Sequence, residues 1–203
     1  TECGNAIASV LAGDVNPSGK LPMTFPVALT DVGAHSVGDY PGTPRTDGSD
    51  IVDCNYSEGI YVGYRWNDKN DIKPLFPFGH GLSYTTFKYG KPSISSDRMS
   101  ADGKITISIP VSNTGNRTGA EVVQLYITDV KSSLPRPVKE LKDFKKVSLK
   151  PNQSTEIQFE ITPDKLMYFD DGRHEWVAEA GDFIALIGSS SSDIKDSVKF
   201  KLL

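Results

Sequence analysis

The chain has 203 residues, enough for one large domain or for one domain with a substantial appendage. Its hydrophobic fraction of 37% and charged fraction of 24% are typical of a globular protein with a core of its own. No apolar stretch approaches the roughly 20 residues that cross a bilayer, so we expect no membrane partner. The formal net charge of -4, with the two signs interspersed, argues against a nucleic-acid partner, which would need a basic face.

The amino-terminal segment, residues 1–26, predicts one helix and one short extended piece. In residues 4–11, Ile7, Val10 and Leu11 form a single apolar stripe at helical spacing. Residues 21–26 are bounded by prolines and suit the edge of a sheet. A lone helix and an edge strand cannot bury an apolar face, so we expect this piece to be the end of a larger α/β layer.

The next segment is irregular at first and then alternates. Residues 27–55 are rich in Gly, Pro, Asp and Thr, which predicts a linker that wraps another surface, with disorder as the alternative. Residues 56–66 alternate in polarity and predict a strand. Glu58 and Trp66 would lie on its more apolar face and Arg65 on the other. An aromatic and glycine-rich connector follows and ends at residue 84. We expect all of residues 27–84 to form the linker.

The pattern after residue 84 is that of an all-β domain, residues 85–203. Short alternating runs are separated by turn clusters, which is the signature of an immunoglobulin-like sandwich. The absence of a Cys-Trp-Cys pattern favours a fibronectin type III topology over an antibody-type domain. The strands are expected at residues 86–89, 104–113, 120–128, 155–161, 174–177, 182–188 and 197–202.

Several motifs, in order along the chain, resemble the C-terminal portion of glycoside hydrolase family 3 enzymes, the β-glucosidases and β-xylosidases. In the motif PVKELKDFKKV at 137–147, the family usually has Gly where this chain has Asp143. The motifs are GNAIA at 4–8, GDVNPSGKLP at 13–22, YSEGIYVGYR at 56–65, PFGHGLSY at 77–84, PVKELKDFKKV at 137–147, Trp176, AGDF at 180–183 and GSS at 188–190.

The resemblance implies a mainly β chain in three parts: the last helix and strand of an α/β sandwich domain, a linker, and a fibronectin type III-like domain. It implies a secreted or periplasmic enzyme without cofactor or metal, although residues 1–5 show no signal-peptide pattern. In the full enzyme, a β-linked glucoside or xyloside would be cleaved from its non-reducing end with retention. Such cleavage needs two carboxyl groups about 5 Å apart.

The same resemblance implies that this chain has no catalytic residue. The family's nucleophile is an Asp of the barrel and its acid/base is usually a Glu of the α/β sandwich, and neither motif is matched here. We therefore expect the chain alone to be inactive, and its partners to be the barrel and α/β domains of the same enzyme. Its role would be to support those domains.

Three residues of the alternating segment are candidates for the rim of a sugar site. Glu58 on an apolar face could be a desolvated acid, although we favour a partly buried Glu that makes backbone hydrogen bonds or an ion pair, with Arg65 or Lys73 as possible partners. Arg65 and Trp66 could flank a sugar, because guanidinium groups bind hydroxyls and aromatic faces stack on sugar rings. The plainer alternative for these two is an anchored edge strand.

Other polar motifs predict structure rather than chemistry. We expect His80 to bond backbone groups in a tight turn, and Asp170 and Asp171 to form a turn, since a calcium loop needs more ligands. Cys3 and Cys54 could pair, but two half-buried thiols are an equal alternative. The Asn-X-Ser/Thr sequons begin at Asn55, Asn116 and Asn152, and they matter only in a glycosylating cell.

Two other functions compete with a supporting role. An independent carbohydrate-binding module would need a row of exposed aromatic residues on one sheet face, for which Tyr126, Tyr168 and Trp176 are the candidates. An adhesion-type domain of a cell-surface protein rests on the sandwich alone.

Overall fold

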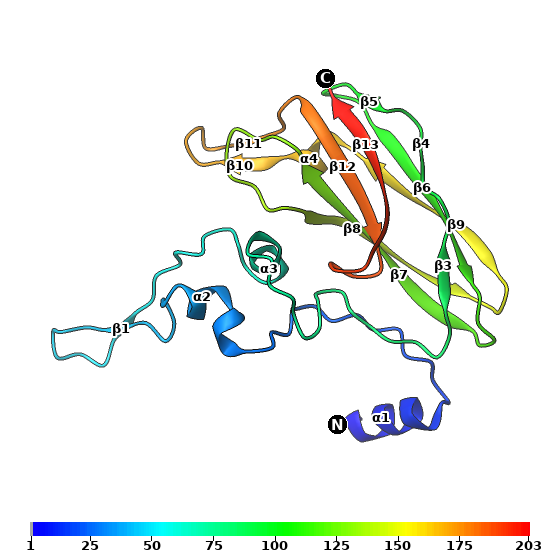
Figure 1. Cartoon of the computed structure of the whole chain (residues 1–203), viewed down its shortest axis with the longest axis horizontal. Helices are drawn as coiled ribbons and strands as arrows, with labels where there is room; N and C mark the ends of the chain where they lie inside the picture. The colour runs from blue at the N-terminus through cyan, green and yellow to red at the C-terminus, as the bar shows by residue number, and fades with distance from the viewer. Residues whose placement is uncertain (1) are drawn as a thin grey trace.

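The computed structural model describes residues 2–203 and contains a two-layer β-sandwich, with the amino-terminal part of the chain running beneath it (Figure 1). One sheet has the order β5-β13-β12-β7-β8, and the other has β3 and β4 on one side of β6 and β9 on its other side. The bounds are β3 Phe87–Tyr89, β4 Ser93–Ile94, β5 Arg98–Met99, β6 Ile105–Asn113, β7 Gly119–Asp129, β8 Glu140–Leu149, β9 Ser154–Ile161, β12 Gly181–Gly188 and β13 Ile194–Leu202. The immunoglobulin-like sandwich predicted from the sequence is confirmed.

The core lies between the two sheets and is built by alternation along the strands. On β6, residues Ile105, Ile107, Ile109 and Val111 all point inward and are at most 2% exposed. A β-strand sends successive side chains to opposite faces, so this run buries one face and leaves the other polar. Further core residues come from both sheets and include Met99, Val123, Leu125, Phe159, Phe183, Phe200 and Leu202.

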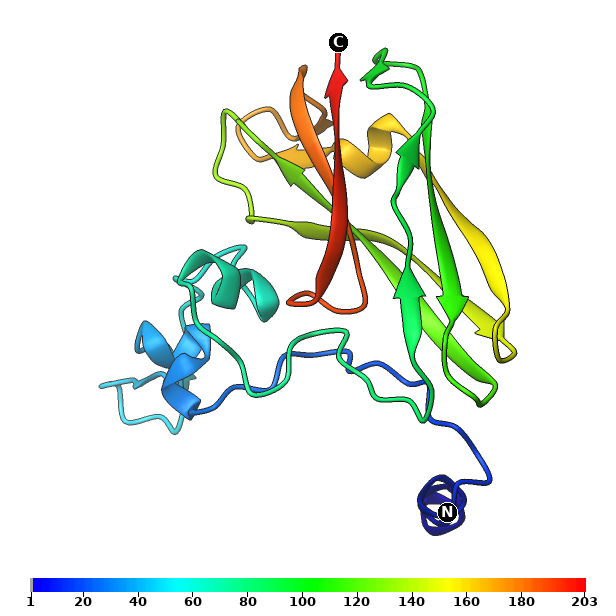
Figure 2. The same cartoon turned by 45° about the vertical axis from the view of Figure 1, so that its right-hand side comes forward.

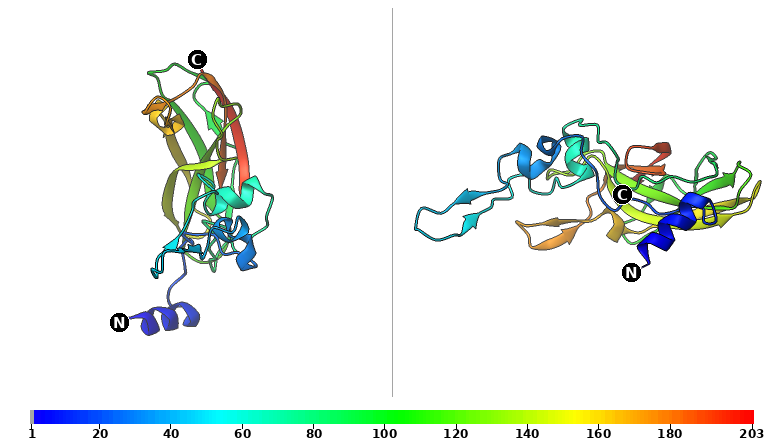
Figure 3. Two further views of the ribbon diagram at one scale, coloured as in Figure 1. Left: turned by 90° about the vertical axis from the view of Figure 1, so that its left-hand side faces the viewer. Right: turned by 90° about the horizontal axis from the view of Figure 1, so that it is seen from below.

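A short helix and a hairpin follow β9. Helix α4, Pro163–Leu166, follows β9 and buries Leu166. The chain then forms the antiparallel hairpin of β10, Tyr168–Asp170, and β11, Glu175–Val177. This hairpin stands apart from the two main sheets and projects from the domain (Figure 3).

The amino-terminal half has little regular structure. Its elements are α1 Cys3–Ala12, the 3₁₀ helix η1 Leu29–Asp31, α2 Gly33–Ser36, β1 Thr43–Pro44, β2 Val52–Asp53 and α3 Tyr64–Lys69. Helix α1 lies away from the sandwich (Figure 2) and has no buried residue. The predicted helix is therefore present, but residues 21–26 form only one isolated bridge, between Phe25 and Phe76, instead of an edge strand. No helix within residues 2–203 has the length and hydropathy of a membrane span.

The strand predicted for residues 56–66 is wrong. The structure has turns there, followed by α3 from Tyr64 onward. The reason lies in the two glycines of the motif, because Gly59 has a φ of 59° and Gly63 a φ of 61°. Both angles belong to the left-handed region, which interrupts an extended strand and which glycine adopts without steric cost.

Hydrogen bonds fasten the amino-terminal half to the sandwich at several points. Near the start of the chain, the Arg117 guanidinium donates to the carbonyl of Gly13 at 2.8 Å. Glu121, 7% exposed, accepts a hydrogen bond from the Tyr89 hydroxyl at 2.8 Å and pairs with Lys20 at 3.3 Å. A buried charge with two such partners is well satisfied, so this contact joins residues before the linker firmly to β3 and β7.

The connector before the sandwich is held by a buried amide. Gln124 of β7 donates from Nε2 to the carbonyls of Gly79 and Ser189, at 3.1 and 2.8 Å. Its Oε1 accepts from the Tyr126 hydroxyl at 2.5 Å. Because these groups satisfy both ends of the amide, Gln124 can remain buried inside the domain and still hold the connector.

Candidate binding cleft

A cleft of about 860 Å³ lies between α3 and the β10–β11 hairpin. One wall comes from the amino-terminal half, through Ile60 and Arg65, and the other comes from the sandwich. The sandwich contributes Leu134, Pro135, Arg136, Pro137, Glu140, Lys142, Met167, Tyr168, Phe169, Asp171 and Trp176. Segments that are far apart in the sequence thus meet only in the folded chain.

Helix α3 is positioned over the cleft by its packing on the sandwich. The Tyr64 ring stacks on Phe78, with 5.1 Å between centroids, and meets Tyr126 edge to face at 5.9 Å. Its hydroxyl accepts a hydrogen bond from the Leu141 backbone nitrogen at 2.9 Å. Aromatic pairs of this geometry add to the apolar burial, so α3 has a defined position beside β8.

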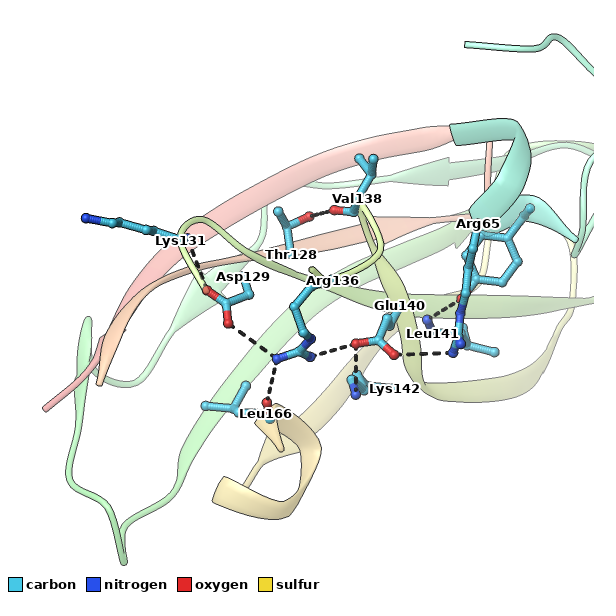
Figure 4. A network of polar contacts seen from close by, with 11 residues as sticks. Arg65, Thr128, Asp129, Lys131, Arg136, Val138, Glu140, Leu141, Lys142 and Leu166 are labelled. Carbon is cyan, nitrogen blue, oxygen red and sulfur yellow. Dashed lines mark hydrogen bonds and ion pairs between the residues drawn. The ribbon is translucent and has the colours of Figure 1, made fainter. Parts of the chain in front are cut away.

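A chain of alternating charges forms the polar floor of the cleft (Figure 4). The Arg136 guanidinium lies 2.6 Å from Glu140 and 3.3 Å from Asp129. Glu140 also pairs with Arg65 of α3 at 3.2 Å and with Lys142 at 3.5 Å. The carboxylate of Glu140 therefore receives three cations and connects the amino-terminal half to β8.

The charges around Glu140 determine whether its carboxyl group could act as a general acid. Burial alone would raise the pKa of Glu140, but the hydrogen bond from Arg136 and the charges of Lys142 and Arg65 outweigh it and hold that pKa below its usual value. Burial, together with the charges of Arg136 and Arg65, lowers the pKa of Lys142 despite its pairing with Glu140. A general acid needs a raised pKa, so Glu140 is suited to holding structure and binding neutral polar groups rather than to protonating a leaving group.

The opposite wall of the cleft is aromatic. Trp176 of β11 is 65% exposed and meets Phe169 of β10 edge to face, with 5.7 Å between ring centroids. The Arg136 guanidinium lies over the ring of Tyr168 at 5.0 Å. A tryptophan that is this exposed is unusual in a folded domain, because it leaves a large apolar face in water.

The structure separates the three rim candidates of the sequence. Arg65 lines the cleft, whereas Glu58 and Trp66 pack behind it around Gly33 of α2, where a Cβ on that glycine would lie 3.1 Å from the indole and 3.4 Å from Glu58. Trp66 is 8% exposed. Among residues 2–203, Glu58 forms an ion pair with neither Arg65 nor Lys73, and Arg65 pairs with Glu140 instead. Within residues 2–203, Oε2 of Glu58 is buried without a hydrogen-bond partner.

Of the other sequence candidates, Tyr168, Asp171 and Trp176 line the cleft, and the rest lie outside it or serve turns. Tyr126 is fully buried, so it cannot stack on a ligand. The His80 ring lies against Phe76 and its carbonyl accepts from the Leu21 nitrogen, as expected of a turn residue. Cys3 and Cys54 are both exposed free thiols, so they do not form a disulfide. In residues 2–203 no three His, Cys, Asp or Glu side chains are grouped as metal ligands would be.

Sequence reasoning missed most of the cleft. Glu140 and Lys142 belong to the motif at 137–147 and Arg136 to none, and no local pattern shows that they meet Arg65. The signal that could have identified them is their unusual density of charge next to two prolines at the start of an edge strand. Arg65 is distant from them in sequence, and the packing of α3 beside β8 brings it to Glu140.

Comparison with known proteins gives one family throughout. The glycosyl hydrolase family 3 C-terminal domain matches residues 1–84, and the fibronectin type III-like domain matches residues 121–191. A β-glucosidase of Bacteroides ovatus, BoGH3A, is 52% identical over 202 residues, which are 98% of this chain and 26% of that protein. Thermostable β-glucosidase B of Acetivibrio thermocellus is 46% identical, over 97% of this chain and 25% of that protein.

Solved structures agree with this result. Thermotoga neapolitana β-glucosidase 3B in complex with glucose superposes with a TM-score of 0.85 at 40% identity, covering 98% of this chain and 26% of that one. The chain thus spans about a quarter of the length of the relatives it matches. It belongs to glycoside hydrolase family 3 and corresponds to the C-terminal portion of the family's β-glucosidases, including their fibronectin type III-like domain.

Proposed function

We propose that the chain is the supporting C-terminal part of a retaining, exo-acting β-glycosidase that acts on β-linked glucosides. Family membership supports the reaction class, and the names of the relatives favour glucosides over xylosides. The catalytic barrel and the rest of the α/β domain would be its partners within the same protein. Secretion or a periplasmic location stays a prediction, as do the boundaries at residues 26 and 84.

The observation that carries this proposal is the unequal burial of the two halves. The sandwich has a complete core, whereas the amino-terminal half leaves large apolar side chains in water, among them Ile7, Leu11, Met23, Val27 and Leu29. Leu11 is 77% exposed although it lies on the apolar stripe of α1. An apolar surface of this kind marks a contact with another folded unit.

The chemistry of the cleft supports the same division of labour. Retaining hydrolysis needs a nucleophile and an acid/base about 5 Å apart on either side of the scissile bond. Glu140 is occupied by three cations, and Glu58 packs behind the cleft wall. We therefore expect both catalytic carboxyl groups to come from outside this chain.

A support must also be joined stiffly to what it supports. The contacts of Glu121 with Lys20 and of Gln124 with Gly79 tie the amino-terminal half to β7, which is buried along most of its length. Through them, the sandwich would fix the orientation of any domain that docks on α1 and the segment after it.

An exchange experiment tests the proposal. The corresponding last quarter of the Bacteroides ovatus β-glucosidase would be deleted, or replaced by this chain, and hydrolysis of an aryl β-glucoside and the melting temperature would be measured. We expect the deletion to lose both activity and thermal stability, and the replacement to recover them. A deletion that leaves the melting temperature and kcat/KM unchanged would refute the supporting role.

A further inference from the structure

We propose that the cleft between α3 and the β10–β11 hairpin binds a segment of a neutral β-linked oligosaccharide. The proposal rests on the function proposed above for its class of ligand. It would let this part of the protein hold a substrate chain as well as support the catalytic domains.

The dimensions of the cleft suit a small ligand. Its volume of about 860 Å³ lies within the roughly 300–1,000 Å³ of ligand pockets in proteins. One wall carries Ile60 and Arg65, and the other carries Phe169 and Trp176. A ligand in the cleft would therefore contact both halves of the chain at once.

The aromatic wall selects a ligand with an apolar face. The Trp176 ring is 65% exposed, and its edge-to-face contact with Phe169 restricts its orientation. The face of an indole carries negative potential, which attracts the weakly positive C–H groups on one face of a pyranose ring. The other edge of that ring carries hydroxyls, which suit the charged floor.

The floor of the cleft selects a neutral ligand. The three cations Arg65, Arg136 and Lys142 are balanced by the carboxylates of Glu140 and Asp171 in the cleft and of Asp129 behind it. An anion or a cation would disturb this balance, whereas hydroxyl groups can accept from guanidinium groups and donate to carboxylates. Arg65, which is only partly buried, has five N–H donors and uses one of them on Glu140.

The two tryptophans of the chain make the test direct. Trp176 is exposed in the cleft, and Trp66 is 8% exposed behind it. The tryptophan fluorescence of the chain would be titrated with cellotetraose and with laminaritetraose. We expect a saturable blue shift with at least one of them, and Trp176→Ala to weaken binding, followed by ligand-observed NMR, by at least about tenfold.

Phe144→Ala is the matched control, because Phe144 is also an exposed aromatic side chain but does not line the cleft. Its binding should equal that of the unchanged chain, and the Trp66 emission of Trp176→Ala should report an intact fold. Absence of saturation with both sugars, or an equal loss in Phe144→Ala, would overturn the proposal. Equal binding of an anionic tetragalacturonate would overturn the argument from charge balance.

This experiment is independent of the supporting role. It measures binding by the chain itself and needs no hydrolysis. If the chain binds the oligosaccharide but its deletion leaves the enzyme unchanged, the proposed binding cleft stands and the supporting role is refuted. If the chain restores the enzyme but binds no oligosaccharide, only the proposed binding to the cleft is refuted.

Discussion

The ammonium nitrogen of Lys139 lies 2.6 Å from a carboxylate oxygen of Asp68, and this ion pair fastens α3 to the chain just before β8. The Lys139 side chain is largely buried, so water screens the pair only partly. Burial raises the pKa of Asp68 even though Lys139 stabilises its charged form. Loss of either charge would therefore leave the other one partly buried without its partner.

Lys139→Met tests this contact. It would leave the Asp68 carboxylate partly buried without its cation, so we expect a loss of about 1–3 kcal/mol in the free energy of unfolding. Urea denaturation measures the loss, and hydrogen exchange should show faster opening of α3. Lys146→Met, at an exposed lysine within β8, should change the free energy of unfolding by less than about 0.5 kcal/mol. Equal effects of the two substitutions would contradict the assigned role.

Glu140 predicts a dependence of stability on pH. Its pKa in the folded chain is held below its usual value, so the unfolded chain binds a proton more readily than the folded one. The stabilisation is present above the unfolded pKa and is lost as pH falls through the folded pKa, in the acid range below the ordinary glutamate value. Glu140→Gln should flatten this part of the stability profile. A profile that keeps its full slope in the variant would show that other carboxyl groups produce it.

Gly79→Ala tests how the connector is held on β7. Gly79 has a φ of 79°, and a Cβ there would collide with the side-chain amide of Gln124. We expect a loss of about 2–4 kcal/mol in the free energy of unfolding from backbone strain and overpacking together. Gly48→Ala provides the comparison, because Gly48 has a φ of 83° but nothing within 4 Å of its Cβ position. Gly48→Ala should lower the free energy of unfolding through backbone strain alone, by about 1–2 kcal/mol.

The unequal burial of the two halves predicts a large loss of stability from one apolar truncation and almost none from another. Phe159→Ala would open a cavity at a fully buried site of β9 and should cost about 3–5 kcal/mol. Leu11→Ala should change the stability of the chain alone by less than about 0.5 kcal/mol, since the side chain is exposed. In the exchanged Bacteroides enzyme, Leu11→Ala should lower the melting temperature. No change there would mean that α1 does not dock on the other domains.

The sandwich could be predicted from the sequence where burial is one-sided. Strands β6, β9 and β12 alternate in polarity because one face is in the core, and that pattern is visible locally. Strand β8 is not predicted from the sequence, because this lysine-rich edge strand is half-buried or exposed along nearly its whole length and shows no alternation. Its place depends on pairing with β7, which no short window of sequence contains.

The cleft could be predicted only in part for the same reason. Arg65 was identified as a rim candidate from its type and its motif, and the structure places it in the cleft wall. Trp66 could not be assigned correctly, because the prediction of a strand put it on the wrong element. The positive φ angles of Gly59 and Gly63 end the extended conformation before Trp66, and a hydrophobic pattern does not reveal such angles.

We expect this chain to support glycoside hydrolysis without performing it. The most direct measurement is the release of p-nitrophenol from aryl β-glucoside and β-xyloside by the purified chain. We predict a rate equal to that of the blank for both substrates. A rate above the blank that disappears when Glu58 or Glu140 is replaced by Gln would place a catalytic carboxyl group in this chain and contradict the account.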